Sequence, residues 1–447
     1  MTNVLIRISP SGKSLEPDAS GNFEVTDLPT GSYTVQTSAD KYKTDITSIQ
    51  VLESQVTDLA IFLTLDRDQN KAPSRPSLVL PAEGVSVTGS SVNLSWNSSD
   101  SDKDSLYYNV LLFKEGQSSS VPIASGIRYD SLLVKNLDYK STYYWQVVVT
   151  DSVSNPVFGE VWSFKTEDAP DLPYLFSRKS DGLFQIFSSN TTETVQLTRN
   201  NANWRPVASP NRKQIAFISN AQTEPHIFVS DLTGQNQQQV TVVPIGGVSL
   251  TELSFCWSPN GTEILYPAYD KLYAVHPDGT GLRVVAKAPA GQFFAGADWT
   301  EQGNLIVART TGGSEYENFL YTIPAATGIL KLLVGGKPGK IGNPAISVDG
   351  KQAAVSMDVS NFSNNEGRQL DAHIFQINLA NGSMTDASGG KAPGTNDLDP
   401  HYSPTGARII FTNMANDGNS PGNIYTTSAL GPDRIELIKN GELSYWR

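Results

Sequence analysis

The chain has 447 residues, which is enough for about three domains of ordinary size. Its 33 Lys and Arg residues against 45 Asp and Glu residues give a net charge of −12, so the chain repels polyphosphates and we expect no nucleic-acid partner. Hydrophobic residues make up 38% and charged residues only 17%, a balance that favours strands and turns over helices. The single cysteine, Cys256, excludes an intrachain disulfide and an all-cysteine zinc site.

Short runs of alternating apolar and polar residues recur between Gly, Pro, Asn and Asp residues. Residues 33–36 and 144–149 have the period-two pattern of half-buried strands. No run of about 12 residues has the period of an amphipathic helix. No apolar run approaches the roughly 18 residues that span a bilayer, so we expect no transmembrane segment. The sequence therefore predicts an all-β protein.

The first seven residues are too few and too polar for a signal peptide. The chain is then either cytoplasmic, or it follows a leader that has been removed. Composition does not choose between these two alternatives.

Two polar stretches with prolines, residues 66–76 and 167–173, indicate linkers. Proline lacks a backbone donor and holds the preceding residue extended, so both stretches are expected to be semi-rigid connectors. They divide the chain into domains at 1–66, 72–168 and 172–447.

The first domain alternates turns and strands, and Phe23, Val25, Tyr33 and Val35 are expected to form one buried face. Its Gly-x-Phe and Leu-Pro-x-Gly-x-Tyr patterns, in residues 21–35, resemble the carboxypeptidase regulatory-like (transthyretin-like) β-sandwich. That family usually has a further strand or two upstream. The resemblance therefore implies an N-terminal truncation, or an edge that something else completes.

The second domain has a tryptophan on an early strand, Trp96, and a corner tyrosine before the strand at 144–149. This pattern resembles the fibronectin type III family and implies an immunoglobulin-like sandwich. Its Asp100-x-Asp102-x-Asp104 stretch is like the start of a calcium loop. Because the glycine and the bidentate glutamate of that motif are missing, we expect a solvated loop and no metal.

The third domain is a repeat array with strand-turn-strand copies of similar sequence. A third strand, a polar turn and a fourth strand follow each copy, and four strands in about 42–56 residues make one propeller blade. The copies begin at 208–217, 257–266, 299–307, 346–355 and 402–411. A sixth unit is split, with later strands at 174–176, 184–187 and 195–197 and its first strand at 443–447. The sequence therefore predicts two small β-sandwiches followed by a six-bladed β-propeller that the C-terminal strand closes.

The Trp-Ser-Pro-Asn-Gly pattern at 257–261 resembles the TolB-type propeller family of WD-like repeats, and also the propellers of prolyl oligopeptidase-like enzymes. The usual Asp of Ser-Pro-Asp-Gly is Asn211, Asn260 or Thr405 here, and Asp349 alone keeps it. The sequence has no Gly-x-Ser-x-Gly elbow, no His-Glu-x-x-His and no phosphate-binding or dinucleotide fingerprint. These absences exclude most common enzyme classes.

Alignment of the blades places two sets of residues on the innermost strands, which line the central channel. One set is Val207, Cys256, Asp298, Ala345 and His401, and the other, two residues earlier, is Arg205, Ser254, Gly296, Asn343 and Asp399. Side chains two apart share a face of a strand. We therefore predict a ligand-binding site at the channel mouth, formed by Arg205, Asp298, Asn343, Asp399 and His401. The alternative is that these polar groups simply face water.

The loops between second and third strands are enlarged at 309–318, 358–371 and 413–422, and are expected to open on the same rim. Their candidate binding residues are Tyr316, Asp358, Phe362 and Asp417, and a solvated insertion is the alternative. The remaining histidines, at positions 226, 276 and 373, are expected to be structural or exposed, and Cys256 to be a buried small hydrophobe.

Two functions fit these observations. The TolB resemblance implies a non-catalytic binding or scaffold protein of a bacterial cell envelope, periplasmic or on the cell surface, with the sandwiches as spacers. Its partner would be a protein or a glycan at the propeller face, and we expect a monomer with no cofactor and no catalytic residue. The alternative is a polysaccharide lyase or glycosidase that uses His401, Asp298 and Asp399 around a metal.

Overall fold

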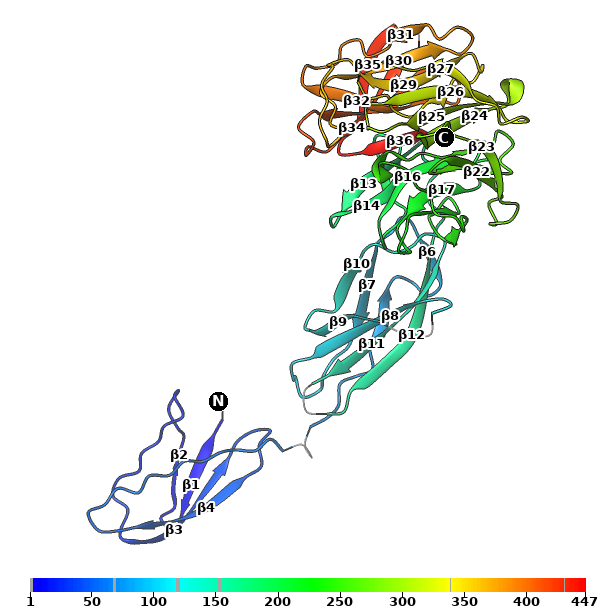
Figure 1. Cartoon of the computed structure of the whole chain (residues 1–447). Coiled ribbons are helices and arrows are strands. Elements are labelled where there is room, and N and C mark those ends of the chain that lie inside the picture. Colours follow the sequence, from blue (N-terminus) through cyan, green and yellow to red (C-terminus); the bar gives the residue numbers. More distant parts are fainter. Residues whose placement is uncertain (1–2, 67–69, 118–120, 152–153, 338, 430) are drawn as a thin grey trace. The chain divides into compact units, whose positions relative to one another are not determined.

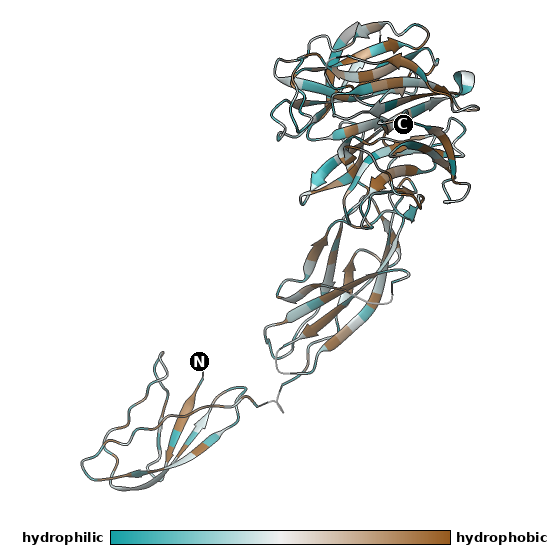
Figure 2. Ribbon diagram, viewed as in Figure 1, coloured by the Kyte–Doolittle hydropathy of each residue, from teal (hydrophilic) through white to brown (hydrophobic). Residues whose placement is uncertain are grey.

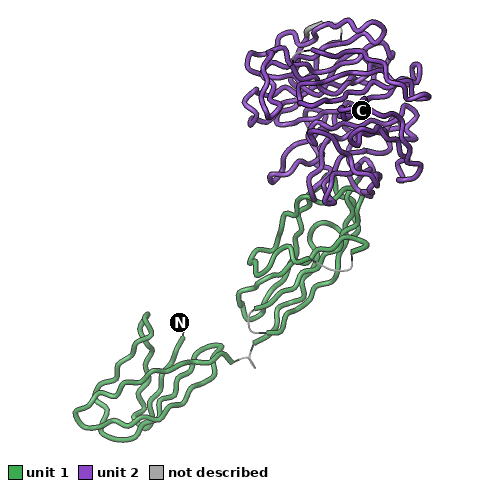
Figure 3. Tube along the Cα trace, in the orientation of Figure 1, with its two compact units in different colours: residues 1–167 green, residues 168–447 purple. Residues whose placement is uncertain are grey.

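The computed structural model describes residues 3–66, 70–117, 121–151, 154–337, 339–429 and 431–447 (Figure 1). Residues 67–69 of the first predicted linker lie outside the described residues. The chain separates into two compact units, residues 1–167 and 168–447 (Figure 3). The helical pieces of the described ranges are two 3₁₀ turns, η1 (Leu250–Glu252) and η2 (Gln302–Asn304). No helix in these ranges has the length and apolar character needed to cross a membrane.

Residues 3–66 form one regular sheet with strand order β2-β1-β3-β4. Tyr33 and Val35 are buried in its core, and Phe23 and Val25 pack against them, as the alternation predicts. Two extended stretches, near residues 22–28 and 57–64, cover the same apolar face without joining the ladder as strands. The strands are β1 (Leu5–Ser9), β2 (Lys13–Leu15), β3 (Gly31–Ser38) and β4 (Asp45–Val51).

Residues 70–167 form two facing sheets, of order β10-β7-β5 and β6-β12-β11-β8-β9. Trp96 and Trp145 are fully buried between them, and the hydroxyl of Tyr143 accepts a hydrogen bond from the backbone N–H of Asp138 at 2.8 Å. A tyrosine hydroxyl bonded to the backbone a few residues upstream is also a feature of immunoglobulin-like sandwiches. The strands are β5 (Ser77–Leu80), β6 (Val85–Val87), β7 (Val92–Asn97), β8 (Tyr107–Lys114), β9 (Val121–Ile127), β10 (Ser131–Val134), β11 (Thr142–Thr150) and β12 (Val157–Thr166).

Residues 168–447 form six four-stranded sheets, each of which is one blade of a β-propeller. Brown apolar segments recur along their strands in Figure 2, because most blade strands are buried on both faces. Blade one consists of β13 (Tyr174–Ser180), β14 (Leu183–Ser189), β15 (Thr194–Gln196) and β36 (Glu442–Trp446). Blade two consists of β16 (Asn203–Ala208), β17 (Ile215–Ser219), β18 (His226–Ser230) and β19 (Gln238–Gln239). Blade three consists of β20 (Cys256–Trp257), β21 (Ile264–Ala268), β22 (Lys271–Val275) and β23 (Arg283–Lys287). Blade four consists of β24 (Phe293–Thr300), β25 (Leu305–Thr311), β26 (Asn318–Pro324) and β27 (Lys331–Val334). Blade five consists of β28 (Ala345–Ile346), β29 (Gln352–Asp358), β30 (Ala372–Asn378) and β31 (Met384–Asp386). Blade six consists of β32 (Thr395–Tyr402), β33 (Arg408–Ala415), β34 (Asn423–Ser428) and β35 (Gly431–Ile438).

The first blade is completed by the last strand of the chain, as the sequence predicts. β36 pairs antiparallel with β13, with Trp446 opposite Tyr174. The two rings also make an edge-to-face contact with centroids 5.0 Å apart. This pairing removes the free edge that β13 would otherwise expose.

The repeated turn that begins with serine has one hydrogen-bond pattern in the blades where it occurs. In blade three the Ser258 hydroxyl donates to the side-chain oxygen of Asn260 at 2.8 Å and accepts the Glu263 N–H at 2.9 Å. Asp349 plays the part of Asn260 in blade five, at 2.7 Å from Ser347. Because the turn needs only a side-chain oxygen at this position, Asn, Asp and Thr all serve there.

Removal of residues 441–447 tests the ring closure. We expect a large fall in the melting temperature of the propeller, because β13 loses its partner and the ring opens. The measurement is thermal unfolding followed by near-ultraviolet circular dichroism. A conservative Trp446→Phe variant is the control and should stay close to the parent; a truncated chain that melts like the parent would contradict the closure.

Candidate functional site

The predicted channel ring is present and has a sixth member. Tyr445 on β36 pairs with Leu175 in the way that His401 pairs with Ile410, so it occupies the equivalent position of blade one. The six side chains line one cavity of about 350 Å³ at the centre of the propeller. They are Tyr445, Val207, Cys256, Asp298, Ala345 and His401.

The cavity opens among the tight turns that connect first and second strands. Exposed Pro210, Pro404 and Val348 lie at its edge, and the half-buried rings of Trp299 and Tyr402 form part of its wall. Part of the opening is therefore aromatic and proline surface, which binds apolar groups by excluding water from them, beside the exposed side chain of Arg212.

The expectation that the enlarged loops share a rim with this site is wrong. In an antiparallel blade, the loop between second and third strands lies where the innermost strand begins, whereas Asp298 and His401 lie near its end, beside the turn to the second strand. Accordingly, none of the loop residues Tyr316, Asp358, Phe362 or Asp417 lines the cavity.

Arg205 and Asp399 form an ion pair across the channel, with Nη1 3.0 Å from Oδ1. Each sits at an irregularity in its innermost strand and has a left-handed backbone, with φ of 55° and 49°. Both residues line the cavity as predicted, but a local irregularity of the strand brings them there, and regular alternation does not. The Arg205 side chain is 5% exposed and is held by the pair in the channel interior.

Asn343, just before blade five, connects blade four with the segment that precedes blade three. Its Oδ1 accepts a hydrogen bond from Arg309 Nε at 3.1 Å, and its Nδ2 donates to the backbone oxygen of Glu252 at 2.5 Å. A side chain at Gly296 would meet Ser254 and Asn343, since an added Cβ would lie 2.0 Å from the Ser254 hydroxyl. Glycine is therefore required at that position of blade four.

Asp298 is held by backbone donors. Its two carboxylate oxygens accept the N–H groups of Trp299 at 2.9 Å and of Ile346, on the next blade, at 2.7 Å. Burial raises the pKa of this carboxyl to about 6, against the lowering effect of the two N–H donors. The carboxylate thus fastens blade four to blade five.

His401 carries the cavity's imidazole. Its ring makes an edge-to-face contact with Tyr445, with centroids 5.4 Å apart, and makes no hydrogen bond to another described residue. Burial and the nearby Arg205 guanidinium lower its pKa to about 4. At neutral pH it is therefore an uncharged imidazole with one donor and one acceptor nitrogen.

The loop candidates Tyr316 and Asp358 hold the enlarged loops together. The Tyr316 hydroxyl donates to the backbone oxygen of Arg368 at 2.7 Å. Asp358 is fully buried and accepts the N–H groups of Ser360 and Asp371 at 2.9 and 3.1 Å. Their polar groups are engaged in loop structure.

The other two loop candidates differ in exposure. Phe362 is half-buried, whereas Asp417 is exposed. Asp417 accepts hydrogen bonds from the hydroxyl and N–H of Ser420 and from the N–H of Asn419, which lower its pKa to about 2. It caps a turn at the loop tip.

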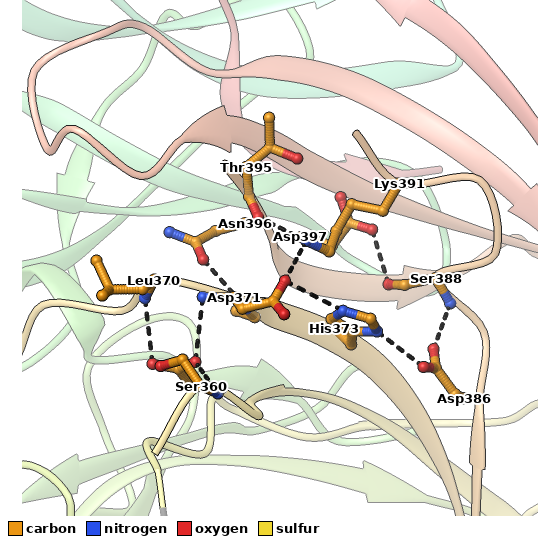
Figure 4. A network of polar contacts seen from close by, with 12 residues as sticks. Ser360, Leu370, Asp371, His373, Asp386, Ser388, Lys391, Thr395, Asn396 and Asp397 are labelled. Carbon is orange, nitrogen blue, oxygen red and sulfur yellow. Dashed lines mark hydrogen bonds and ion pairs between the residues drawn. The ribbon is translucent and has the colours of Figure 1, made fainter. Parts of the chain in front are cut away.

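The remaining histidines and the cysteine have structural surroundings. His373 lies between two carboxylates, with Nδ1 2.7 Å from Asp386 and Nε2 3.2 Å from Asp371 (Figure 4). His226 is buried with Nδ1 3.1 Å from the Thr241 hydroxyl, and His276 is exposed in its turn. Cys256 is buried, and burial raises the pKa of its thiol well above the usual range, which opposes reactivity.

Sequence reasoning missed a charged network at the loop end of the channel. Glu252 pairs with both Arg309 and Lys340, and Lys340 also pairs with Glu315. Arg309 and Glu315 belong to blade four, whereas Glu252 and Lys340 lie in connections before blades three and five, so no repeated spacing marks the four residues. Among the described residues, no group of three or more His, Cys, Asp or Glu could hold a metal ion.

Comparison with known proteins gives likeness of fold only. No family model matches the chain, and no curated protein matches it. Among solved structures, TolB from Acinetobacter baumannii is 16% identical over 70% of this chain and 80% of its own, with a TM-score of 0.48. An oligogalacturonate lyase from Vibrio parahaemolyticus is 13% identical over 56% and 85%, with a TM-score of 0.36. A GH74 enzyme from Niastella koreensis is 12% identical over 59% and 44%, with a TM-score of 0.37.

The His401→Asn variant tests the half-buried neutral imidazole. The pKa of His401 is about 4 in the folded chain and about 6.5 in the unfolded chain. Between pH 6.5 and pH 4 this histidine is therefore protonated in the unfolded chain and neutral in the folded chain. Wild-type stability from this group is therefore full above pH 6.5 and is lost as the pH falls towards 4, by about 2 kcal/mol. Urea unfolding between these pH values should show a shallower loss in the variant, with exposed His276→Asn as control; parallel curves would contradict the assignment.

The Asp298→Asn variant should show the opposite sign. The folded pKa of about 6 lies above the usual aspartate value of 3.8, so this group favours the folded state below pH 3.8 and progressively less as the pH rises through 6. Across that window the stability of the wild type relative to the variant should fall by about 2 kcal/mol. Urea unfolding at several pH values measures this difference, and an unchanged or rising difference would count against a raised pKa of Asp298.

Proposed function

We propose that this chain is a non-catalytic recognition protein of a bacterial cell envelope, and that its propeller binds a segment of a partner protein in the cavity among the tight turns. The composition of the cavity carries the proposal. Part of its opening is aromatic and proline surface, whereas its carboxylates already serve the fold: Asp399 pairs with Arg205, and Asp298 accepts two backbone N–H groups.

The size and chemistry of the cavity suit a few amino-acid side chains. Its volume of about 350 Å³ is within the range of small ligand pockets. Apolar side chains would be bound by burial against Trp299 and Tyr402. The neutral imidazole of His401 and the hydroxyl of Tyr445, which make no hydrogen bond to other described residues, would orient the polar backbone of the segment.

The envelope location and the role of residues 1–167 belong to the same proposal. The Ser-Pro-Asn-Gly blade turns resemble those of TolB-type propellers, and the two N-terminal domains resemble carboxypeptidase regulatory-like and fibronectin type III modules. The backbone hydrogen bond of the Tyr143 hydroxyl and the buried Trp96 support the second assignment. These domains would act as spacers of a monomeric protein on the periplasmic side or at the cell surface.

A polysaccharide lyase or glycosidase is the second candidate, and His401 is the observation that favours it. A neutral imidazole with a free nitrogen can accept a proton from a substrate. The carboxylates beside it are held by an arginine and by backbone donors, which favours binding over acid-base chemistry at this site.

Site-specific photo-crosslinking of the full chain tests the proposal. A benzophenone side chain at Val348, which is 55% exposed at the cavity edge, should give a discrete protein adduct in cells of the source organism. The same group at Asn419, exposed on an enlarged loop at the other end of the blades, is the matched control. Adducts from Asn419 alone, or from neither position, would overturn the proposed site.

Incubation with neutral and acidic polysaccharides separates the two candidates. We expect no release of new reducing ends by the wild type. Release that disappears in His401→Asn while the fold is retained would favour the enzyme.

A further inference from the structure

The loop end of the channel is covered by a short strap of the chain itself, residues Ser249–Leu253, which includes η1. The strap has no buried residue in its 3₁₀ turn, and Leu250 is 48% exposed. Leu253 is buried and anchors one end. The rest of the strap is therefore held mainly by polar contacts that its residues make with the blades.

Glu252 makes the main contacts of the strap with other blades. Its carboxylate lies 3.1 Å from Arg309 Nη2 and also pairs with Lys340 Nζ, while its backbone oxygen accepts Asn343 Nδ2. The cations are almost completely buried, at 2% and 4% side-chain exposure, whereas Glu252 is 27% exposed. The binding groups thus belong to the rigid blades, and the carboxylate is brought to them by an exposed turn.

A cavity of about 100 Å³ lies beneath this contact and is separate from the cavity among the tight turns. Its wall contains three cationic groups, Arg205, Arg309 and Lys340, and two carboxylates, Glu252 and Asp399. Two buried polar atoms in its wall, Arg205 Nε and Gln369 Oε1, have no hydrogen-bond partner in the part of the chain that the structure describes. The cavity therefore has a polar wall with room for about three water molecules or one small polar group.

The charge balance depends on Glu252. Glu315 pairs with Lys340, and Asp399 pairs with Arg205, so Glu252 is the carboxylate that neutralises Arg309. Without it, one buried positive charge has no counterion among the described residues of the cluster. A buried unpaired charge is costly and attracts an anion of matching geometry.

We propose that Arg309 and Lys340 form a carboxylate-binding site, that Glu252 is its built-in occupant, and that an acidic side chain of a partner protein displaces the strap and takes its place. This site lies at the opposite end of the channel from the proposed recognition cavity and goes beyond that proposed function. The guanidinium fork and the ammonium together match the two oxygens of a carboxylate. The present contacts of Glu252 show that Arg309 and Lys340 can bind a carboxylate together.

The carboxylate site is tested by chemical rescue of Glu252→Ala in the full chain. We expect the melting temperature of the propeller to fall by roughly 5–10 °C, because a buried cation loses its partner. Sodium formate or acetate at about 100 mM should restore most of this loss, and sodium chloride of equal ionic strength should not. Glu263→Ala removes a carboxylate from the Arg283 pair at the surface and is the matched control, for which no rescue is expected.

Displacement of the strap is tested in the unmodified protein, so this experiment does not depend on whether a variant folds. Hydrogen exchange of residues 248–253 should speed up several-fold when a hexaglutamate peptide is added, and hexaglutamine should have no effect. Glu252→Ser, which also removes the carboxylate and leaves its place empty, serves for the rescue if Glu252→Ala does not fold.

Each result decides one part of the proposal. Rescue by formate together with faster exchange of the strap supports it. Equal effects of formate and chloride would overturn the carboxylate site. Rescue without faster exchange in the unmodified protein would overturn displacement by a partner and leave Glu252 as a fixed structural group. These outcomes do not depend on the crosslinking at Val348.

Discussion

The pairing of β36 with β13 is the constraint on which the propeller depends, because it converts a row of blades into a ring. A row would expose one strand edge at each end, and each blade buries its faces only against two neighbours. Closure also brings Tyr445 into the channel beside His401, so the cavity has residues from the last strand of the chain as well as from the repeats. The binding surface and the closure of the fold therefore share one strand.

Closing the ring creates a channel in which charge must be paired. The interior is narrow and partly desolvated, so isolated charges are unfavourable there. The charged groups of the channel are stabilised in two ways. Asp298 uses backbone N–H groups of its own and the next blade, and Arg205 and Asp399 pair with each other across the channel. The left-handed backbone at Arg205 and Asp399 is the local cost of aiming both side chains inward.

Period-two alternation and the repeated turn that begins with serine predicted most of the fold from the sequence. The turn could be recognised despite its varied third residue, because Ser209, Ser258 and Ser347 make the same bonds with Asn or Asp oxygens. The channel ring was predictable for the same reason, since one register places one residue of each blade on the axis. Tyr445 was missed because its strand, β36, is the last of the chain and is not followed by the second strand of its blade, β13, so no strand-turn-strand copy sets its register.

The polar contacts of the channel were not predictable, for two physical reasons. A bulge shifts the facing of a strand by one residue, and neither Arg205 nor Asp399 has a sequence feature that marks a left-handed backbone. Long-range pairs such as Glu252 with Arg309 depend on how far each connection extends over the channel, which no local pattern encodes. The enlarged loops were assigned to the wrong end of the channel. Their length is visible in the sequence, but their distance from Asp298 and His401 depends on the direction of the innermost strand, and both residues lie near the end of that strand.

The two ends of the channel have different chemistry because different parts of the blades form them. At the turn end, short turns of fixed geometry place prolines and half-buried rings such as Tyr402 around an open cavity. At the loop end, longer connections cover the axis and bring their own charges, so Lys340 and Arg309 are buried beneath Glu252. The Arg205–Asp399 pair and Asn343 line both cavities and lie between them. A ligand that moved this ion pair from the turn end would therefore also alter the wall of the site beneath the strap, which gives the two ends a direct physical connection.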